Sequence, residues 1–413
     1  MKIISFVKKQ LEQIKNGGIR IFYKKLYKVI EYTAILSFGG LILILCKGIK
    51  PIKYIRFGRL YTSRIGHLCS NMDNYIFIRA DRKSNEIGFF LPDKFISNQS
   101  ILKKWREVDG IFIGRIALGP VLFLELFAPK SRLLISFSDE MGPLFSETSS
   151  SPSNIKMNDE NEENFQKIST QYGLKKPYVC FHNRDSAYLK YWGLNLIDPN
   201  DHDYRDFDFD DYRMGAEELT RRGIQSVRVG DKVAVESKID TSHLISFTGS
   251  NSYDLDLIEN SIFFVGTNSG MSCVSRILRK PELLINYIPF EVNRLSMYAC
   301  NSIIVPKKLY KIAESRYLTF SEINSILYNI HYQGNFYQDM GIRIENNTEE
   351  EIKNAIIEMH AWVTGKWSDS PIQEELQNKF WDSFEINKII KKTRKNLGIK
   401  ISSTYLEKNP HLI

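Results

Sequence analysis

Short apolar segments alternate with helix-like segments through the middle of this chain, and this alternation constrains the fold more than any other feature. Helical patterns between the apolar runs occupy 210–222, 252–259 and 271–279, and Gly223 ends the first of them. Parallel strands need long crossover connections, usually helices, so this order predicts a doubly wound parallel sheet. The predicted strands cover 178–181, 224–229, 261–265 and 283–287.

A similar rhythm precedes residue 147. Strands are predicted at 53–57, 87–91 and 111–116, with helical patterns at 65–76 and 100–108. Residues 147–164 are polar and acidic and are interpreted as a linker or exposed loop. Sequences typical of capping boxes, at 319–322 and 348–351, open later helices, and 349–397 is mainly helical in pattern.

The length of 413 residues favours two domains. We therefore expect two Rossmann-like α/β domains, with a helical segment at each end of the chain. The predicted boundaries are a basic, apolar segment at 1–50, a first domain with its linker at 51–165, a second domain at 166–345 and C-terminal helices at 346–413.

The positive charge is concentrated at the N-terminus. The chain has a formal net charge of +8, but residues 1–60 contain 13 lysines and arginines against only Glu12 and Glu31. The remaining 353 residues carry 43 basic and 46 acidic side chains. A nucleic-acid-binding protein more often carries its charge on the folded domain, so we expect no nucleic acid partner. A polybasic end suits an anionic membrane surface.

An uncharged run, TAILSFGGLILILC, occupies 33–46. Its 14 residues fall short of the roughly 20 that a spanning helix needs, and no small-residue cleavage site follows it, so we expect neither a span nor a signal peptide. Two interpretations stay open: a buried helix packed on the first domain, and the favoured one, an interfacial helix on the inner face of the cytoplasmic membrane. Gly39 and Gly40 argue against a straight helix.

The cysteines indicate a reducing compartment. The chain has five of them, widely spaced and without a C-x-x-C pair, and the seven histidines are scattered as well. We therefore expect a cytoplasmic protein without a zinc site or a cofactor.

Polar side chains follow three of the predicted strands of the second domain. Ligands of doubly wound sheets bind beyond the carboxyl ends of the strands, so these side chains are the candidate binding residues. They are, in chain order, His182, Arg184 and Asp185 after 178–181, Arg228 and Gly230 at the end of 224–229, and Gly266, Thr267, Ser269 and Gly270 after 261–265.

The sequence GTNSG at 266–270 separates a strand from a helix. Backbone N–H groups converge on an anion in such a turn, and the helix dipole adds to the attraction. The alternative is an ordinary capped turn. Arg184 and Arg228 are expected at the same edge, and guanidinium groups match phosphate oxygens in a bidentate way. The three strand ends together predict a diphosphate site.

The acidic run at 206–211 contains the spacing DxD, which is able to hold a divalent metal under a nucleotide diphosphate. These carboxylates also precede a helix directly, where negative charge is favourable. The second interpretation is stronger, and we expect Asp206 and Asp208 not to bind a metal.

The sequences HNRDSAYLK, HDYRDFDFDDYRMGAEELTRRGIQSVRVG and FFVGTNSGMSCVSRILRKPELLINYIP resemble a family of bacterial glycosyltransferases from surface-polysaccharide loci. The sequence GRLYTSRIGHL at 58–68 resembles the N-terminal loop of that family. The three strand-end motifs are also similar to those of fucosyltransferase-like enzymes of the GT-B fold. One departure is Ser275, which stands where the family usually has a proline.

The resemblance implies a metal-independent GT-B enzyme of the hexosyl- or deoxyhexosyl-transferase type. It implies a nucleotide-sugar donor, most often a GDP- or UDP-sugar, held by the second domain, and a glycan or lipid-linked acceptor. The implied donor-binding residues are His182, Arg184, Tyr204, Arg205, Arg228, Gly230, Gly266, Thr267, Ser269 and Gly270.

A glycosyltransferase also needs a general base for the acceptor hydroxyl. His67, on the N-terminal loop of the resemblance, and Asp185 are the candidates. Each has a structural alternative: His67 as an ordinary residue of a helical turn, and Asp185 as an ion-pair partner that orients Arg184.

Two other classes of protein share a two-domain α/β architecture. A nucleotide-sugar epimerase would show G-x-G-x-x-G after its first strand, and this chain has none there. A nucleotide- or sugar-binding module without transferase activity stays open as the alternative function.

Overall fold

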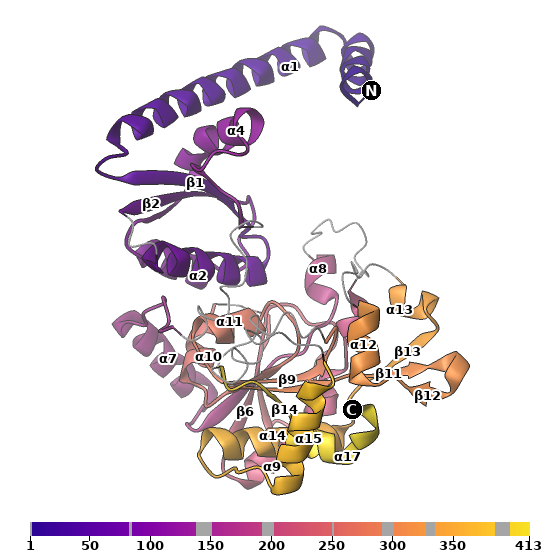
Figure 1. Cartoon of the computed structure of the whole chain (residues 1–413). Helices are drawn as coiled ribbons and strands as arrows, with labels where there is room; N and C mark the ends of the chain where they lie inside the picture. The colour runs from indigo at the N-terminus through magenta and orange to yellow at the C-terminus, as the bar shows by residue number, and fades with distance from the viewer. Residues whose placement is uncertain are drawn as a thin grey trace. The chain divides into compact units, whose positions relative to one another are not determined.

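The computed structural model describes residues 2–81, 85–137, 151–191, 202–249, 252–290, 301–327, 335–384 and 397–413. The chain divides into two compact units (Figure 1). Unit 1 consists of Met1–Leu60, Arg79–Asp93 and Asp109–Glu140, and unit 2 of Tyr61–Ile78, Lys94–Val108 and Met141–Ile413.

Unit 2 is built on a seven-stranded parallel sheet with the strand order β14-β10-β9-β8-β5-β6-β7. After β5 the chain forms β6 and then β7, which is the edge strand on that side. The next strand, β8, pairs with β5 on its other side. The order of strands therefore reverses between β5 and β8. The strands are β5 (Tyr178–Phe181), β6 (Gln225–Val229), β7 (Leu244–Phe247), β8 (Phe264–Gly266), β9 (Glu282–Tyr287), β10 (Ser302–Pro306) and β14 (Lys400–Ile401).

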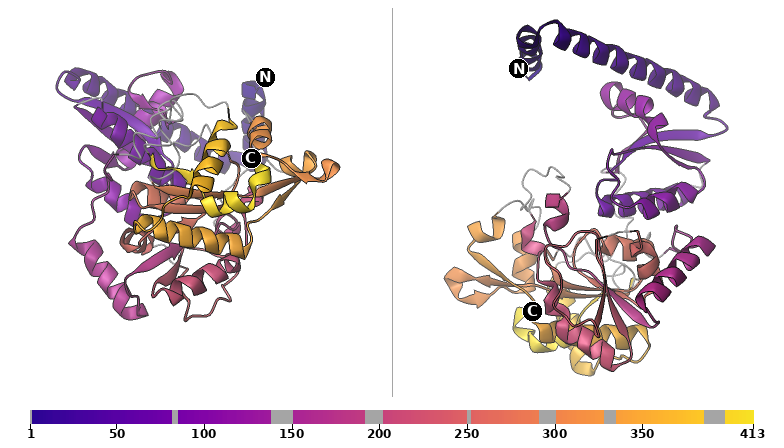
Figure 2. Two further views of the ribbon diagram at one scale, coloured as in Figure 1. Left: turned by 60° about the horizontal axis from the view of Figure 1, so that its bottom comes forward. Right: turned by 180° about the vertical axis from the view of Figure 1, so that it is seen from behind.

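Helices cover both faces of this sheet (Figures 1 and 2). α9 and α14 pack together on one face, and α7, α10 and α11 lie on the other. The sheet is buried on both sides, which explains its continuous apolar strands: every residue of β5 and of β9 is buried. The helices are α7 (Asp159–Tyr172), α8 (Ala187–Tyr191), α9 (Arg213–Arg221), α10 (Asp254–Asn260), α11 (Ser272–Ile277), α12 (Phe320–Leu327), α13 (Phe336–Asp339), α14 (Glu349–Val363), α15 (Pro371–Asp382) and α17 (Ser403–Lys408).

Both predicted capping boxes are present. In α14 the side chain of Thr348 accepts a hydrogen bond from the N–H of Glu351, whose carboxylate accepts one from the N–H of Thr348. The same reciprocal bonds join Thr319 and Glu322 at the start of α12.

A small antiparallel sheet of the order β12-β11-β13 follows β10 and consists of β11 (Lys308–Lys311), β12 (Arg316–Tyr317) and β13 (Ile342–Glu345).

Two stretches differ from the sequence prediction. The predicted linker at 147–164 ends in a helix, because α7 starts at Asp159, after a capping box of Asn158 and Asn161. Residues 138–150 lie outside the described residues.

Residues 61–78 and 94–108, predicted in the first domain, cluster with unit 2. Within unit 2, Asp73 forms an ion pair of 2.8 Å with Arg279. The helices of this region are α2 (Ile65–Asp81) and α3 (Gln99–Glu107).

Unit 1 contains a four-stranded parallel sheet of the order β3-β2-β1-β4. One face is covered by α1 (Lys2–Ile49) and α4 (Leu118–Phe127), whose buried side chains Leu43, Cys46, Val121 and Leu124 form one core with Phe57 and Leu91 of the sheet. The strands are β1 (Tyr54–Leu60), β2 (Glu86–Pro92), β3 (Ile111–Ile113) and β4 (Leu134–Ile135). The predicted α/β class is confirmed: the chain has two units built on parallel sheets, an apolar N-terminal helix and C-terminal helices.

Gly39 does not break α1, contrary to the sequence expectation. The interruption lies at Gly18, where φ is 62° and ψ is −163°. At Gly39 the backbones of α1 and α4 touch: a Cβ atom there would lie 2.3 Å from the backbone carbonyl atoms of Gly119. Glycine is needed at this position for close helix packing.

Substitution of Gly39 is therefore expected to destabilise unit 1. Gly39→Ala forces the two backbones apart, and we expect a loss of about 1–3 kcal/mol in the free energy of unfolding, measured by urea denaturation of the full chain. The matched control is Gly48→Ala in the same helix, where a Cβ atom meets nothing within 4 Å. The control is expected to be neutral or slightly stabilising. Equal stability of the two variants would contradict the close packing.

Candidate functional site

The three polar strand ends meet at one edge of the sheet of unit 2. Phe181, the last residue of β5, pairs with Val265 of β8 on one side and with Arg228 of β6 on the other. The loops that follow β5 and β8 therefore leave the sheet side by side, where the strand order reverses. In open α/β sheets the crevice for ligands lies at such a switch point. We call this edge the switch edge.

Arg184 is a buried cation at the switch edge, with 8% of its surface exposed. Its Nη1 donates to the carbonyl oxygen of His202 at 2.9 Å and pairs with the carboxylate of Asp206. Its Nη2 is buried and has no hydrogen-bond partner among the described residues. Burial, and then the neighbouring Arg205, lower the pKa of Arg184 to about 10. An anion at Nη2 would satisfy both the charge and the open donor.

Arg205 joins a second loop to the same edge. It ends the short 3-10 helix η2 (Asp203–Arg205), and its Nη1 donates to the carbonyl oxygen of Asn268 at 3.1 Å. Its Nε is buried without a partner among the described residues, as is Oγ of Ser269. Burial lowers the pKa of Arg205. Three buried polar atoms, on three different loops, are thus unsatisfied at this edge.

His182 is held as a neutral imidazole. Its Nδ1 lies 3.1 Å from the carbonyl oxygen of Val229, which only accepts, so Nδ1 carries the proton. Burial lowers the pKa of His182 to about 4, and the Val229 bond opposes that shift only in part. Its Nε2 is left with a lone pair that is able to accept from a hydroxyl group. Gly230, with φ of 134°, lies against the ring, since a Cβ atom there would be 3.1 Å from Nδ1.

Arg228 lies beneath the edge and not on its surface. It is 1% exposed, its guanidinium stacks 4.0 Å from the ring centroid of Phe209, and it donates to Asn183 Oδ1 at 3.4 Å and to the carbonyl oxygen of Val235. Burial lowers its pKa. These contacts make Arg228 a support of the loop after β5, and its direct binding to a donor stays a prediction.

Asp185 bridges two loops. Its Oδ1 accepts from the N–H of Ala187 and its Oδ2 from the N–H of Ala234, both at 2.9 Å. The proposed alternative, an ion pair with Arg184, is not the contact observed, because Arg184 pairs with Asp206.

The turn at 266–270 is tightly packed. Thr267 is fully buried, and its hydroxyl donates to the carbonyl oxygen of Asn286 at 3.2 Å. A Cβ atom on Gly266 would lie 2.5 Å from the ring of Phe264, and one on Gly270 would lie 2.5 Å from Ile65. The helix that follows, α11, is only six residues long. The glycines and Thr267 therefore serve the packing of the turn, while Ser269 offers an unsatisfied hydroxyl.

His67 is brought next to this turn by its neighbour Gly66. A Cβ atom on Gly66 would lie 3.4 Å from Cα of Gly270. His67 itself is exposed in the first turn of α2, with its ring 5.9 Å from that of Tyr61 in an edge-to-face contact. His67 thus directly follows the residue of α2 that contacts the turn, within the same unit.

Sequence reasoning missed Lys307. It is 4% exposed, and its Nζ donates to the carbonyl oxygens of Tyr204 and Asp206, at 3.0 Å each, so that it fixes the loop that carries Arg205. Burial lowers the pKa of Lys307 to about 8; the nearby Asp211 opposes this shift and Arg184 adds to it. The available signal was its position directly after strand β10.

Tyr204, another predicted donor-binding residue, lies on the same loop. Its ring packs against that of Tyr337, with 5.5 Å between the ring centroids.

The carboxylates of the DxD spacing have other partners. Asp206 pairs with Arg184, and Asp208 caps the 3-10 helix η3 (Phe209–Tyr212) by accepting from the N–H of Asp210. Within the part of the chain that the structure describes, no group of three or more His, Cys, Asp or Glu side chains is arranged to hold a metal ion.

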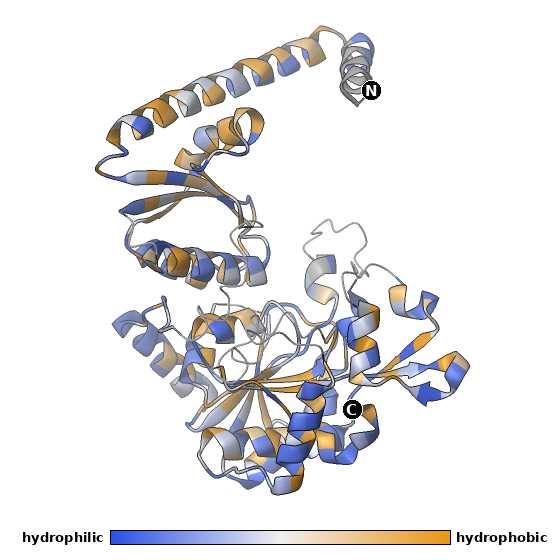
Figure 3. Cartoon of the chain, in the orientation of Figure 1, coloured by the Kyte–Doolittle hydropathy of each residue, from blue (hydrophilic) through white to orange (hydrophobic). Residues whose placement is uncertain are grey.

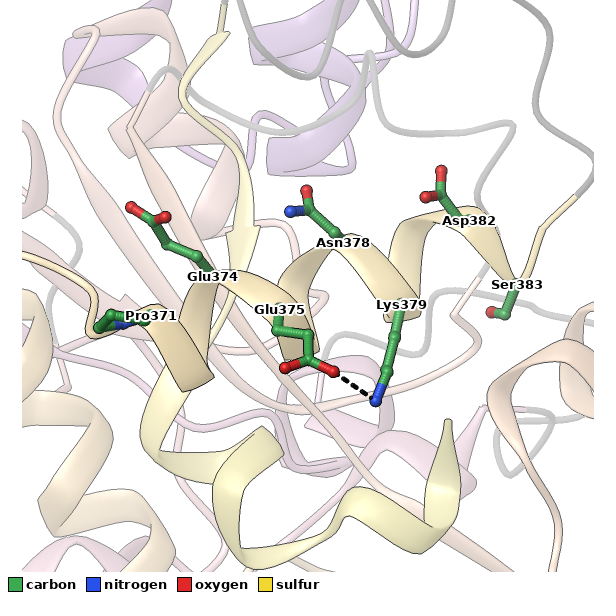
Figure 4. A pocket seen from close by; sticks show the side chains of 7 residues that line it. All are labelled: Pro371, Glu374, Glu375, Asn378, Lys379, Asp382 and Ser383. Atoms are coloured by element: carbon green, nitrogen blue, oxygen red, sulfur yellow. Dashed lines mark ion pairs between the residues drawn. The ribbon is translucent and has the colours of Figure 1, made fainter.

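One surface hollow lies elsewhere in unit 2, along α15 (Figure 4). An ion pair of 2.7 Å between Glu375 and Lys379 crosses it, and no residue of the switch edge contributes to it. Its lining residues are Pro371, Glu374, Glu375, Asn378, Lys379, Asp382 and Ser383. Its exposed acidic lining does not suit an anion, so it is not the candidate site.

No family model and no curated protein matches this sequence. Solved structures similar to this one include a glycosyl transferase family 9 protein from Veillonella parvula, at 11% identity and a TM-score of 0.48, covering 74% of this chain and 96% of that chain. The ADP-heptose LPS heptosyltransferase II of E. coli has 11% identity and a TM-score of 0.40, over 60% and 90% of the two chains.

The iron-containing dodecameric glycosyltransferase TibC from enterotoxigenic E. coli has 12% identity and a TM-score of 0.39, over 75% of this chain and 77% of that chain. All three TM-scores lie below 0.5. A function for this chain therefore has to be argued from its own residues.

The neutral state of His182 predicts a pH dependence. Its pKa of about 4 lies below the value of about 6.5 in an unfolded chain, so the unfolded state binds more protons between these pH values. Stability from this residue is thus present above pH 6.5 and is lost as the pH falls towards 4. His182→Asn keeps a donor for Val229 but does not titrate.

Urea unfolding at pH 7.5 and 4.5 measures this effect. Wild type is expected to lose about 2 kcal/mol more than His182→Asn between the two conditions. Parallel changes in both proteins would show that His182 is protonated without cost.

Proposed function

We propose that this chain is a glycosyltransferase that moves a hexosyl or deoxyhexosyl group from a nucleotide-diphosphate sugar to a glycan or lipid-linked acceptor in bacterial surface-polysaccharide synthesis. The observation that carries this proposal is the pair of guanidinium groups of Arg184 and Arg205 at the switch edge, each with a buried nitrogen that has no partner among the described residues. The resemblance of the strand-end motifs to polysaccharide glycosyltransferases supports it.

The chemistry of sugar transfer requires this kind of edge. When the bond between the sugar and the phosphate breaks, negative charge grows on the departing nucleoside diphosphate. Fixed donors that point at developing charge are commonly the largest contribution to catalysis. Arg184 and Arg205 supply such donors, and the burial of the two open nitrogens keeps competing water away from them. Lys307 holds the loop that carries Arg205 in place.

The acceptor hydroxyl needs a general base. We propose His67 for this role, because it is exposed and directly follows Gly66, which contacts the turn at 266–270. Asp185 is the weaker candidate, since each of its oxygens already accepts a backbone N–H bond. Burial lowers the pKa of His182 to about 4, so it is a weak base and is better suited to accept a hydrogen bond from a hydroxyl group of the nucleotide sugar.

We propose further that no metal takes part. The carboxylates that would hold one are engaged, Asp206 with a buried arginine and Asp208 in a helix cap. A nucleotide-binding module without transferase activity needs the same diphosphate site, so product detection with an acceptor is what separates it from the transferase.

Arg184 is the residue to test. Arg184→Ala removes a charge-assisted fork, so binding of GDP or UDP is expected to weaken by about 2–4 kcal/mol in titration calorimetry. Arg184→Lys keeps the charge without the fork and is expected to give an intermediate loss. The matched control is Arg343→Ala, which removes an exposed arginine of the small sheet that pairs with Glu345.

The same titrations are run in excess chelator, where wild-type affinity and transfer are expected to be unchanged. Equal nucleotide affinity of wild type and Arg184→Ala, with both proteins folded, would remove Arg184 from the donor site. Loss of activity in chelator that manganese restores would return Asp206 and Asp208 to the role of metal ligands.

A further inference from the structure

Unit 1 exposes a large amount of apolar surface on α1. The part of this helix at Lys15–Ile49 is long and apolar enough to cross a membrane by length and composition, and only 17% of its most apolar window is buried. The uncharged run of 14 residues on its own suggested a shorter apolar segment. A helix with so little of its surface buried is not an ordinary core helix. The exposed side chains of its C-terminal half include Phe38, Leu41, Ile44 and Leu45, which are 55–67% exposed.

The packing of α1 excludes a lone spanning helix. Its apolar run is pressed against α4 at Gly39 and Gly119, and Leu43 and Cys46 are buried in the core of unit 1. A span through these residues would pull α4 and the neighbouring sheet into hydrocarbon. Lipid-exposed sheet edges do not occur there, because their backbone groups would be unsatisfied. The run therefore lies along the folded unit, with one face on protein and the other face uncovered.

α4 exposes apolar side chains in the same layer. Leu126 and Phe127 at its C-terminal end are 63% and 65% exposed. Ile116, in the 3-10 helix η1 (Arg115–Ala117) before α4, is 61% exposed. Figure 3 shows apolar residues along both α1 and α4. The one acid of α4, Glu125, pairs with Arg59 at 2.8 Å, so it adds no unpaired charge.

The edge strand extends this apolar layer. Phe112 of β3 is 50% exposed and stacks on Phe89 of β2, with 4.9 Å between ring centroids. Phe89 in turn stacks on Phe57, which belongs to the core under α1 and α4. Phe112 thus lies on the sheet face that carries the two helices.

We propose that α1 and α4 together form a membrane-binding surface that lies in the headgroup layer of an anionic leaflet. The lipid face consists of Phe38, Leu41, Ile44, Leu45, Leu126 and Phe127. We choose a bilayer as the partner because of charge. Residues 1–60 carry 13 basic and two acidic side chains, and this excess of positive charge suits the anionic cytoplasmic leaflet. An apolar protein partner would not require it. This inference does not depend on the donor chemistry.

The test uses the full chain and changes α4 alone. Leu126→Asp combined with Phe127→Asp places two charges on the proposed lipid face at positions that are already exposed. The matched control is Ile312→Asp with Ile372→Asp, two positions of unit 2 that are 57% and 64% exposed. Thermal unfolding of both double variants verifies that they fold.

Partition is measured by flotation with vesicles of phosphatidylglycerol and phosphatidylethanolamine at 0.1 M and 1 M salt. Each lost apolar contact costs about tenfold in partition, so the α4 double variant is expected to bind about 100-fold more weakly than wild type, and the control unchanged. Salt is expected to weaken all three, because the Debye length falls from about 10 Å to about 3 Å.

Equal flotation of wild type and the α4 double variant would overturn the role of α4. Absence of wild type from the floating fraction at 0.1 M salt would overturn the membrane surface altogether. A wild-type dimer in light scattering that becomes monomeric in the α4 double variant would assign this face to a second copy of the chain and would overturn the proposal as well.

Discussion

The buried charge of Arg184 is the constraint on which the switch edge depends. A guanidinium with 8% exposure needs compensation, and it finds one carboxylate, Asp206, and one carbonyl oxygen. Arg205 lies close enough to lower its pKa further. Nη2 of Arg184 and Nε of Arg205 have no partner among the described residues, and a diphosphate is the kind of ligand that would satisfy both.

The supporting contacts follow from that constraint. Lys307 fixes the loop of Arg205 and Asp206 through two carbonyl oxygens, and Asn183 is held by Arg228 from below. These residues keep the guanidinium groups in place without contacting the proposed ligand. In a preorganised site of this kind, little rearrangement is needed when charge develops on the leaving group.

Much of the fold was predictable because its signals are local. Strands such as β5 and β8 are continuous apolar runs, and the caps at Thr319 and Thr348 lie within four residues of chain. Pairing of β5 with β8 at the switch point is seen only in the structure. Other features depend on distant residues: Gly39 is explained only by Gly119 of α4, and α1 bends instead at Gly18.

The site was predicted in position more than in detail. The sequence placed Arg184 and Arg228 at one edge, but burial decides that Arg228 supports the loop while Arg184 keeps a free donor. The carboxylate of Asp206 was expected to stabilise the start of the following helix by its negative charge, but it pairs with Arg184. Lys307 follows a strand end, but it lies more than 100 residues from the carbonyl groups that it binds, so its role is seen only in the structure.

Hydrogen exchange with and without GDP and UDP tests the central claim most directly, namely that the switch edge holds the diphosphate of a donor. The exchange of backbone amides is followed by mass spectrometry across the full chain. Bound nucleotide is predicted to protect the loops at 182–186, 202–208 and 266–270 and to leave the hollow along α15 unchanged. Nucleotide binding that leaves these three loops unprotected, or that protects only residues of α15, would contradict the account.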